Sequence, residues 1–226
     1  MRIGIPVATE RVEVPNYYVN VAYVNLIAKA GFEPVLITPQ NIPDCDGLLL
    51  PGGIDVDPIY YGYDNETSRN TDIEKDKFER NLLWKFIEMK KPIFGICRGF
   101  QFIFLEFCKK FPDNDKFLDY AQHIDGHNQN ELKIVRNQPS HFVELSTGPF
   151  AVNSFHHQAC LVLEKELTKS RQLTILGTTD RDTIKNYLII ECFKIPEWNV
   201  MAVQWHAEEM EGAEEFLKDH FNKEDE

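Results

Sequence analysis

Cys97 stands in a stretch whose residue types could support covalent catalysis. In FGICRGFQ, Gly95 lies two residues before Cys97 and Gly99 two residues after it. The layout G-x-C-x-G matches the nucleophile elbow G-x-S-x-G, in which a strained strand-to-helix turn exposes the nucleophile. Glycines are expected there because side chains at the flanking positions would collide. A helix that begins at Arg98 would also favour the thiolate through its free N–H groups and dipole, so we predict that Cys97 is a nucleophile.

A thiolate nucleophile needs a base, and the base needs a group that orients it. His206 and Glu208 lie in QWHAEE, at the end of an apolar strand predicted over residues 201–205. Residues i and i+2 of an extended chain point to the same side, so Glu208 could hold one ring nitrogen of His206 while the other faces a thiol. Glu209 would point away and be solvated. The alternative is an edge-strand histidine followed by a solvated glutamate.

The other four cysteines lack such a setting. A buried structural role is expected for each, because free cysteine is among the most buried residue types; they are Cys45, Cys108, Cys160 and Cys192. The chain has five cysteines in all, and none is spaced as C-x-x-C. That count disfavours a zinc site and a secreted disulfide framework, and it favours reduced thiols in the cytoplasm.

The elements that must position these residues alternate between strands and helices in the first half of the chain. Apolar runs predict strands over residues 2–7, 33–38, 45–50 and 91–96, and helical spacing predicts helices over 20–30, 74–89 and 100–109. Residues 54–73, rich in Asp, Tyr, Asn and Gly, are expected to form a long surface loop. This alternation predicts an α/β fold with a mostly parallel central sheet flanked by helices.

The second half of the chain has a different pattern. Strands are predicted over 132–135, 173–176, 187–192 and 201–205 with few helices between them, which indicates a smaller antiparallel portion. An acidic helix over 211–221 closes the chain. We expect one domain over residues 1–226, with residues 221–226 frayed.

Charge and hydropathy exclude several classes of partner. Of the 226 residues, 24 are basic and 36 acidic, which gives a net charge of -12. Such a balance argues against nucleic acid or an anionic membrane surface as a partner. No apolar run reaches the length of a membrane span, and no G-x-x-x-x-G-K-[ST] phosphate loop is present. We expect no cofactor and no metal.

Several motifs together resemble those of class I glutamine amidotransferases. FGICRGFQ and QWHAEE carry the likeness, and LPGGIDVDP with the following Tyr61-Gly62 and NSFHHQ narrows it to the stand-alone branch related to γ-glutamyl-γ-aminobutyrate hydrolase. The similarity runs from Arg2 to about Glu215. It implies a flavodoxin-like class I amidotransferase fold and a Cys-His-Glu triad.

The resemblance implies a role for each matching position. Cys97 would attack the γ-carbonyl of a glutamine-like substrate and form a thioester, His206 would transfer protons and Glu208 would orient His206. The backbone N–H groups of Gly53 and Arg98 would form the oxyanion hole.

Substrate contacts follow from the same resemblance. Gln101 and the backbone at Phe155 and His157 would hold the α-amino and α-carboxylate groups, and Gly52 would also border the substrate. A packed or solvated pair of histidines is the alternative for the NSFHHQ motif.

Three positions depart from the family pattern. Ala207 stands where relatives usually have proline, although the spacing of the histidine and the glutamate is unchanged. Lys75-Asp76 replaces the usual Arg-Asp, which we interpret as a surface difference. FLEFCKKFPDNDKFLD, residues 104–119, replaces a loop that often holds a glycine pair, so substrate contacts from that region are not carried over.

Three functions remain open. The first is a hydrolase of a small γ-glutamyl amide that releases glutamate and ammonia, an amine or a phosphoramidate. The second is a glutaminase subunit that passes ammonia to a synthetase partner. The third is an inactive regulatory or metal-binding module, with zinc held by His123, His127, His156 and His157, whose spacing is not a familiar one. A homodimer is also open.

Overall fold

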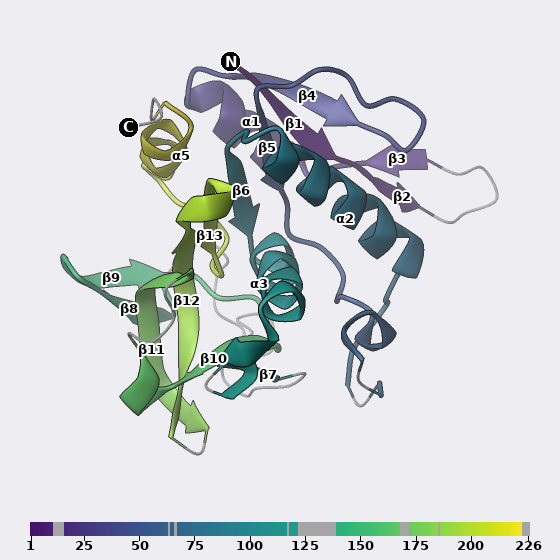
Figure 1. The fold of residues 1–226 in the computed structure, drawn as a ribbon. Coiled ribbons are helices and arrows are strands. Elements are labelled where there is room, and N and C mark those ends of the chain that lie inside the picture. The colour runs from purple at the N-terminus through teal and green to yellow at the C-terminus, as the bar shows by residue number, and fades with distance from the viewer. Residues whose placement is uncertain are drawn as a thin grey trace.

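The computed structural model describes residues 1–10, 16–62, 64–65, 67–116, 118–121, 139–167, 172–184 and 186–222. The strand predicted over 132–135 lies outside these residues, as do His123 and His127. Figure 1 shows the strands of the N-terminal half covered by helices, and most strands of the second half beside one another in a continuation of the same sheet.

The centre of the sheet is parallel, as the sequence predicts. Across the described residues the sheet runs β4-β1-β5-β6-β13-β12-β11-β8-β9, and the pairs from β4 through β13 are parallel. These strands are β4 (Glu33–Ile37), β1 (Arg2–Pro6), β5 (Gly47–Leu50), β6 (Ile93–Ile96) and β13 (Val200–Val203). Because β5, β6 and β13 are parallel neighbours, their carboxyl ends meet at one edge of the sheet.

The antiparallel portion extends this sheet from β12 onward (Figure 1). Its strands are β12 (Tyr187–Ile195), β11 (Thr174–Ile184), β8 (His141–Leu145), β9 (Gly148–Val152), β10 (Ala159–Leu163) and β7 (Leu118–Ala121). The predicted strands over 173–176 and 187–192 are parts of β11 and β12. A small separate hairpin pairs β2 (Ala8–Glu10) with β3 (Asn16–Tyr18).

Two of the helices, α1 and α2, begin at side-chain caps. α1 (Val21–Lys29) follows Asn20, whose side chain accepts a hydrogen bond from the Ala22 N–H at 2.9 Å. α2 (Ile73–Glu88) follows Asp72, whose carboxylate accepts from Glu74 and Lys75. These caps satisfy backbone donors that would otherwise lack partners in the first helical turn.

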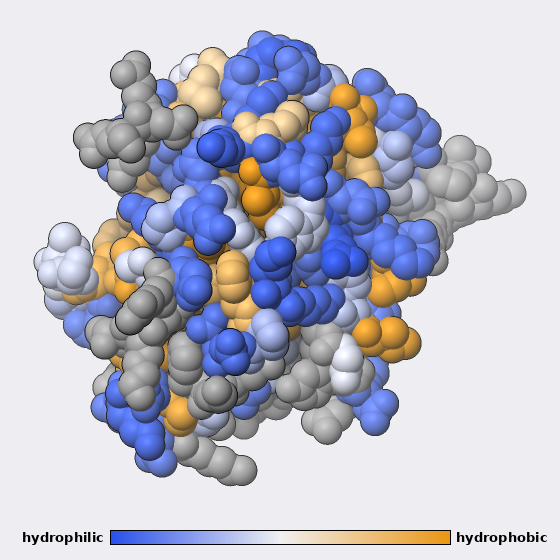
Figure 2. Space-filling view, viewed as in Figure 1, coloured by the Kyte–Doolittle hydropathy of each residue, from blue (hydrophilic) through white to orange (hydrophobic). Residues whose placement is uncertain are grey.

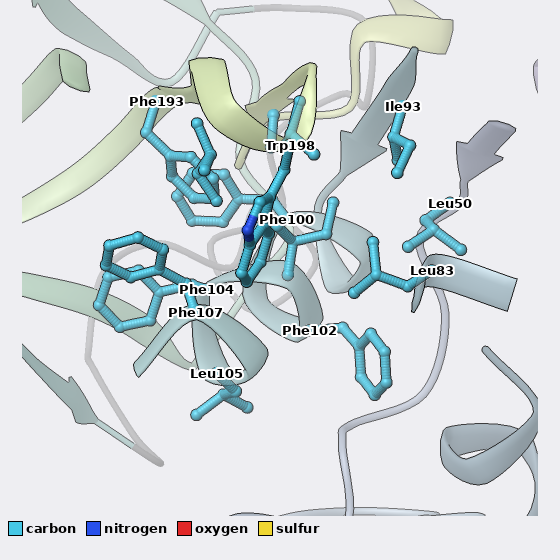
Figure 3. Close-up of a cluster of buried hydrophobic side chains, with 14 of the residues drawn as sticks. Leu50, Leu83, Ile93, Phe100, Phe102, Phe104, Leu105, Phe107, Phe193 and Trp198 are labelled. Carbon is cyan, nitrogen blue, oxygen red and sulfur yellow. The ribbon is translucent and has the colours of Figure 1, made fainter. Parts of the chain in front are cut away.

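α3 (Arg98–Lys110) lies at the centre of the largest hydrophobic cluster (Figure 3). Phe100, Phe104 and Phe107 are fully buried, and the Phe100 ring lies 4.7 Å from that of Phe193. Burial of each such ring contributes about 2–3 kcal/mol. The helix predicted over 100–109 is therefore confirmed, and the loop assigned to residues 104–119 does not begin at residue 104; after α3 the chain forms a 3-10 turn (Pro112–Lys116) and β7.

The C-terminal helix also differs from the prediction. α5 covers Glu214–Phe221 and begins later than expected. Phe221, which was expected to fray, is 2% exposed, and its ring packs against Phe32 and Phe94. Aromatic burial thus anchors the last turn, whereas residues 223–226 lie outside the described chain.

The surface is mainly hydrophilic. Figure 2 shows charged and polar residues over most of one face, with hydrophobic residues in small groups. No helix among the described residues has the length and apolar character needed to cross a membrane.

Candidate active site

The nucleophile elbow predicted at Cys97 is present in the backbone. β6 ends at Ile96, α3 begins at Arg98, and Cys97 between them has φ 51° and ψ -105°. Non-glycine residues rarely adopt positive φ, and such strain clusters at functional sites. The Cys97 side chain is 7% exposed, at the edge where β5, β6 and β13 end.

Both glycines of the elbow are required by close contacts. A Cβ atom on Gly99 would lie 2.2 Å from the Leu50 carbonyl oxygen, and one on Gly95 would lie 2.7 Å from Ile103 Cδ1 and 3.1 Å from the Gly99 backbone. The expected collision of side chains at these positions is therefore confirmed. It arises because the start of α3 crosses directly over the end of β5.

His206 and Glu208 are paired, although not by the geometry that the sequence suggested. His206 Nδ1 lies 2.6 Å from Glu208 Oε1, and the Glu208 side chain is 1% exposed. β13 already ends at Val203, and Ala207–Glu209 forms a 3-10 turn (η5). The turn, not an extended strand, brings the carboxylate back to the ring, and Glu209 is partly buried rather than solvated.

Cys97 and His206 meet beside Gly52. A Cβ atom on Gly52 would lie 3.1 Å from His206 Cε1 and 3.5 Å from Cys97 Cβ. Burial by itself lowers the pKa of His206, but the negative charge of Cys97, hydrogen bonding to Cys97 and the Glu208 carboxylate outweigh it and raise that pKa well above its ordinary value. The arrangement therefore favours the protonated, positively charged form of His206.

The backbone of His206 is held by Asn153, which the sequence did not single out. Asn153 Nδ2 donates to the His206 carbonyl at 3.0 Å, and the His206 N–H donates to Asn153 Oδ1 at 2.8 Å. Its place in NSFHHQ was the only signal in the sequence. This two-point contact fixes the chain beyond β13, where sheet hydrogen bonds end.

Gln101 lies close to the site, but its amide is already engaged. Gln101 Nε2 donates to the Gln158 carbonyl at 3.2 Å and to Gln204 Oε1 at 3.1 Å. Its Oε1 accepts from the Tyr120 hydroxyl at 3.4 Å. A substrate contact by Gln101 would therefore require some of these hydrogen bonds to be exchanged.

Phe155 and His157 lie on opposite sides of His156 in the chain and have different surroundings. The Phe155 ring packs edge-on against His206 at 5.6 Å between centroids. His157 Nε2 lies 2.9 Å from Asp55 Oδ2, which ties this segment to the loop after β5. His156 is buried, and its Nδ1 lies 2.8 Å from the Gln158 carbonyl.

A pocket of about 300 Å³ opens beside His206 and Glu208. Gly52, Gly53 and Phe155 border it, so three residues predicted to touch substrate or oxyanion are brought together there. Its remaining lining residues are Pro6, Ala8, Tyr18, Val19, Asn20, Tyr23, Pro51, Ile54 and Lys75. Tyr60, which belongs to the loop expected over residues 54–73, does not border this pocket and packs against Phe102 and Lys109.

Arg98 anchors the elbow through a buried group of charges. Its guanidinium forms ion pairs with Asp76 and Glu79 of α2, and Glu79 also pairs with Lys75. Asp76 and Glu79 are fully buried, and the Lys75 side chain is 8% exposed. The interpretation of Lys75-Asp76 as a surface difference is therefore wrong: both residues belong to the support of the site.

The remaining cysteines have the surroundings expected for structural residues. Cys45, Cys160 and Cys192 are buried, and Cys108 is partly buried. Burial raises the pKa of Cys160 well above its ordinary value and that of Cys192 to about 12. Such thiols are poor nucleophiles near neutral pH.

The described residues contain no group of three or more His, Cys, Asp and Glu side chains that could hold a metal ion. His156 and His157 face different partners, Glu191 and Asp55. Within the described chain, the histidine pair therefore supplies no zinc site.

Comparison with known proteins agrees with this fold. At 28% identity, the chain is similar to a Lactococcus lactis protein described as glutamine amidotransferase-like, over 84% of this chain and 80% of that protein. It is 25% identical to γ-glutamyl-γ-aminobutyrate hydrolase of Escherichia coli, over 82% and 76% of the two chains. A glutamine amidotransferase from Thermotoga maritima, 12% identical, shares the fold with a TM-score of 0.56 over 92% of this chain and 76% of that one. The peptidase C26 model matches residues 3–208, so the chain belongs to the peptidase C26 family of γ-glutamyl hydrolases and glutamine amidotransferase-like proteins.

Proposed function

We propose that this protein is a cysteine-dependent hydrolase that cleaves the γ-glutamyl amide bond of a small glutamine-like substrate. Cys97, His206 and Glu208 are its catalytic residues. The observation that carries the proposal is the convergence of the positive-φ Cys97 elbow with the His206–Glu208 pair beside one pocket. Elbow, base and orienting carboxylate are the parts that covalent catalysis by a thiolate needs.

In the first half of the reaction, the Cys97 thiolate attacks the γ-carbonyl carbon and a C–S bond forms. The carbonyl oxygen becomes an oxyanion, which the backbone N–H groups of Gly53 and Arg98 stabilise. Loss of one such donor typically costs about 3–4 kcal/mol of transition-state stabilisation. The C–N bond then breaks as the His206 imidazolium gives its Nε2 proton to the leaving amine.

In the second half, neutral His206 takes a proton from water, and the resulting hydroxide attacks the thioester. The C–S bond breaks, glutamate leaves, and the thiolate–imidazolium pair is restored. Glu208 keeps its hydrogen bond to Nδ1 throughout, so that Nε2 remains directed at the reacting atoms.

The lining of the pocket supports a leaving group larger than ammonia. Pro6, Ala8 and Val19 give one part of the wall an apolar character. An amine leaving group with some apolar surface therefore fits the site better than ammonia, the leaving group of glutamine.

A substrate panel tests the proposal. The purified protein is assayed for glutamate release from L-glutamine and from a series of γ-glutamyl amides. Cys97→Ala should abolish release and the covalent γ-glutamyl intermediate, because no other group can begin the covalent step. The intermediate is measured by mass spectrometry of the rapidly quenched enzyme.

Cys108→Ala is the matched control, since it removes a partly buried thiol from α3, the helix that follows Cys97. It should keep nearly full turnover. Turnover by Cys97→Ala at the wild-type rate would refute the assignment of the nucleophile.

A further inference from the structure

Tyr23 on α1 has a buried hydroxyl among the groups of the candidate site, and the mechanism above does not use it. Its side chain is 4% exposed. The hydroxyl oxygen accepts a hydrogen bond from the Gly52 N–H at 3.0 Å. Since a phenol can accept and donate at once, its proton can be directed at a second partner.

The carboxylate of Glu208 has one oxygen in use and one that lacks a donor. Oε1 lies 2.6 Å from His206 Nδ1. Oε2 is buried, and no donor among the described residues reaches it with full hydrogen-bond geometry. A buried carboxylate oxygen without a donor destabilises the fold, so a nearby hydroxyl would form a hydrogen bond to it.

Tyr23 is close to this carboxylate. A Cβ atom on Gly52 would lie 2.5 Å from the Tyr23 hydroxyl and 3.1 Å from His206 Cε1, so the hydroxyl and the histidine border the same small space. Tyr23 and Glu208 line the same pocket, and α1 packs against η5, which carries Glu208. Burial, then the negative charges of Glu208 and Cys97, and then a side-chain hydrogen bond to Glu208 raise the pKa of Tyr23 well above its ordinary value, and the hydrogen bond from the Gly52 N–H opposes them only in part, so the phenol stays a donor.

We propose that Tyr23 is a positioning residue, whose hydroxyl accepts the Gly52 N–H and donates its proton to Glu208. The inference rests on the proposed function, because it places Tyr23 behind the same base. Through these two contacts one hydroxyl joins α1, the Pro51–Gly53 turn and η5. It sets the turn that presents the Gly53 N–H, and it fixes the orientation of the carboxylate that holds His206.

The contact also has an electrostatic consequence. A donor to Glu208 draws part of its negative charge away from the His206 ring. Removal of that donor leaves the carboxylate to attract the imidazolium proton more strongly, so the pKa of His206 should rise further. The ionisable groups around His206 are Cys97 from the elbow, Glu208 from η5 and Tyr23 from α1, with Lys75 of α2 on the same pocket wall.

Tyr23→Phe tests the role, because it removes the hydroxyl and keeps the ring in its hydrophobic cluster. Misplacement of the base and the oxyanion donor should lower kcat by about 10- to 100-fold. KM should change by less than about 3-fold, since the hydroxyl acts mainly on the transition state. The basic limb of the kcat/KM profile should move to higher pH.

Tyr17→Phe is the matched control. Tyr17 is 46% exposed and its hydroxyl is bonded to Gln40, away from the pocket lining. This variant should keep the wild-type kcat and pH profile. Thermal unfolding of both variants shows whether either has lost its fold.

The rate at which iodoacetamide alkylates Cys97 measures the effect of Tyr23 on the pKa of His206 without any substrate. This rate is measured against pH in the wild type and in Tyr23→Phe, with Cys97→Ala as the blank. If the pKa of His206 read from the alkylation rates is higher in Tyr23→Phe than in the wild type, the positioning role of Tyr23 is supported. This holds even if the protein hydrolyses no γ-glutamyl amide, because that result would count only against the proposed function. The proposal is wrong if Tyr23→Phe folds and keeps the wild-type kcat. It is also wrong if the pKa of His206 is unchanged in both the kcat/KM profile and the alkylation profile, because Tyr23 would then contribute only hydrophobic packing.

Discussion

At the scale of the residue, the charge on His206 decides what the site can do. Burial lowers its pKa, but Cys97 and Glu208 more than reverse this, so the folded-state pKa lies well above the unfolded value of about 6.5. A group whose pKa is raised in the folded state increases the free energy of unfolding. This contribution is complete below the unfolded-state pKa and is lost as the pH rises through the folded-state pKa. The pairing of His206 with Cys97 and Glu208 should therefore stabilise the fold fully below about pH 6.5, and this stabilisation should be lost only as the pH rises through the raised folded-state pKa of His206.

The pH dependence of kcat/KM should show this. We expect the basic limb of the wild-type profile to lie well above pH 6.5, because loss of the imidazolium proton ends leaving-group protonation. Cys97 and Glu208 both raise the pKa of His206, and Glu208→Gln removes the second of these charges, so its basic limb should fall to lower pH, opposite to the shift expected for Tyr23→Phe. A pH–rate series on the best substrate measures both.

His206→Asn provides the comparison within the same pair. It should lower kcat by about 10⁴-fold, since no general acid or base remains. Glu208→Gln should cost less, because the glutamate orients the histidine and transfers no proton. Small and equal losses for both variants would support the alternative of a structural edge-strand histidine.

At the scale of the element, α2 supports the nucleophile through charge. Arg98, the first residue of α3, is buried against Asp76 and Glu79 of α2, with Lys75 as the second cation. Each of the two cations contacts at least one of the two carboxylates. Removal of one partner from a buried group of this kind leaves an uncompensated charge, which costs more than the intact group contributes.

Glu79→Gln should therefore lower the free energy of unfolding by about 3–5 kcal/mol. Glu74→Gln is the control on the same helix, where Glu74 forms an ion pair with Lys77 at 2.8 Å and both side chains are more than half exposed. That change should cost less than about 1 kcal/mol. Urea denaturation followed by circular dichroism measures both, and similar losses would contradict the supporting role of the buried group.

At the scale of the whole molecule, the sheet assembles the site from distant parts of the chain. β5, β6 and β13 are adjacent and parallel, and each is followed by a segment of the site: the Pro51–Gly53 turn, the Cys97 elbow and the chain to His206. Helices on the same fold supply Tyr23 and Arg98. Every group that the proposed chemistry needs thus comes from this one chain.

The isolated chain should therefore be active without a partner protein. We expect a kcat/KM of at least about 10⁴ M⁻¹s⁻¹ on its best γ-glutamyl amide, within the ordinary range for enzymes. Glutamine should be a poorer substrate, because it lacks a leaving group that can contact the pocket wall. Steady-state assays of the purified chain measure both. Activity on glutamine only, and only after a synthetase is added, would instead favour the ammonia-donor function.

The sequence by itself determined the parts of this protein that depend on short-range pattern. Helical spacing located α1, α2 and α3, apolar runs located the parallel strands, and the glycines around Cys97 located the elbow, because each of these features is encoded within a few neighbouring residues. The short strands β7 to β10 were not predicted, since their pairing depends on partners far along the chain. The 3-10 turn at Glu208 was missed for a similar reason: an i, i+2 pair fits either a strand or a turn.

Only the tertiary structure decided which polar residues share the site. Lys75 and Asp76 look like surface charges on an amphipathic helix, yet the packing of α2 against the elbow buries them beside Arg98. Tyr23 looks like any apolar position of α1, yet its hydroxyl meets Gly52 and lies close to Glu208. Burial and partner choice arise when segments far apart in the chain pack together, and a local pattern carries no record of the surface that a side chain will meet.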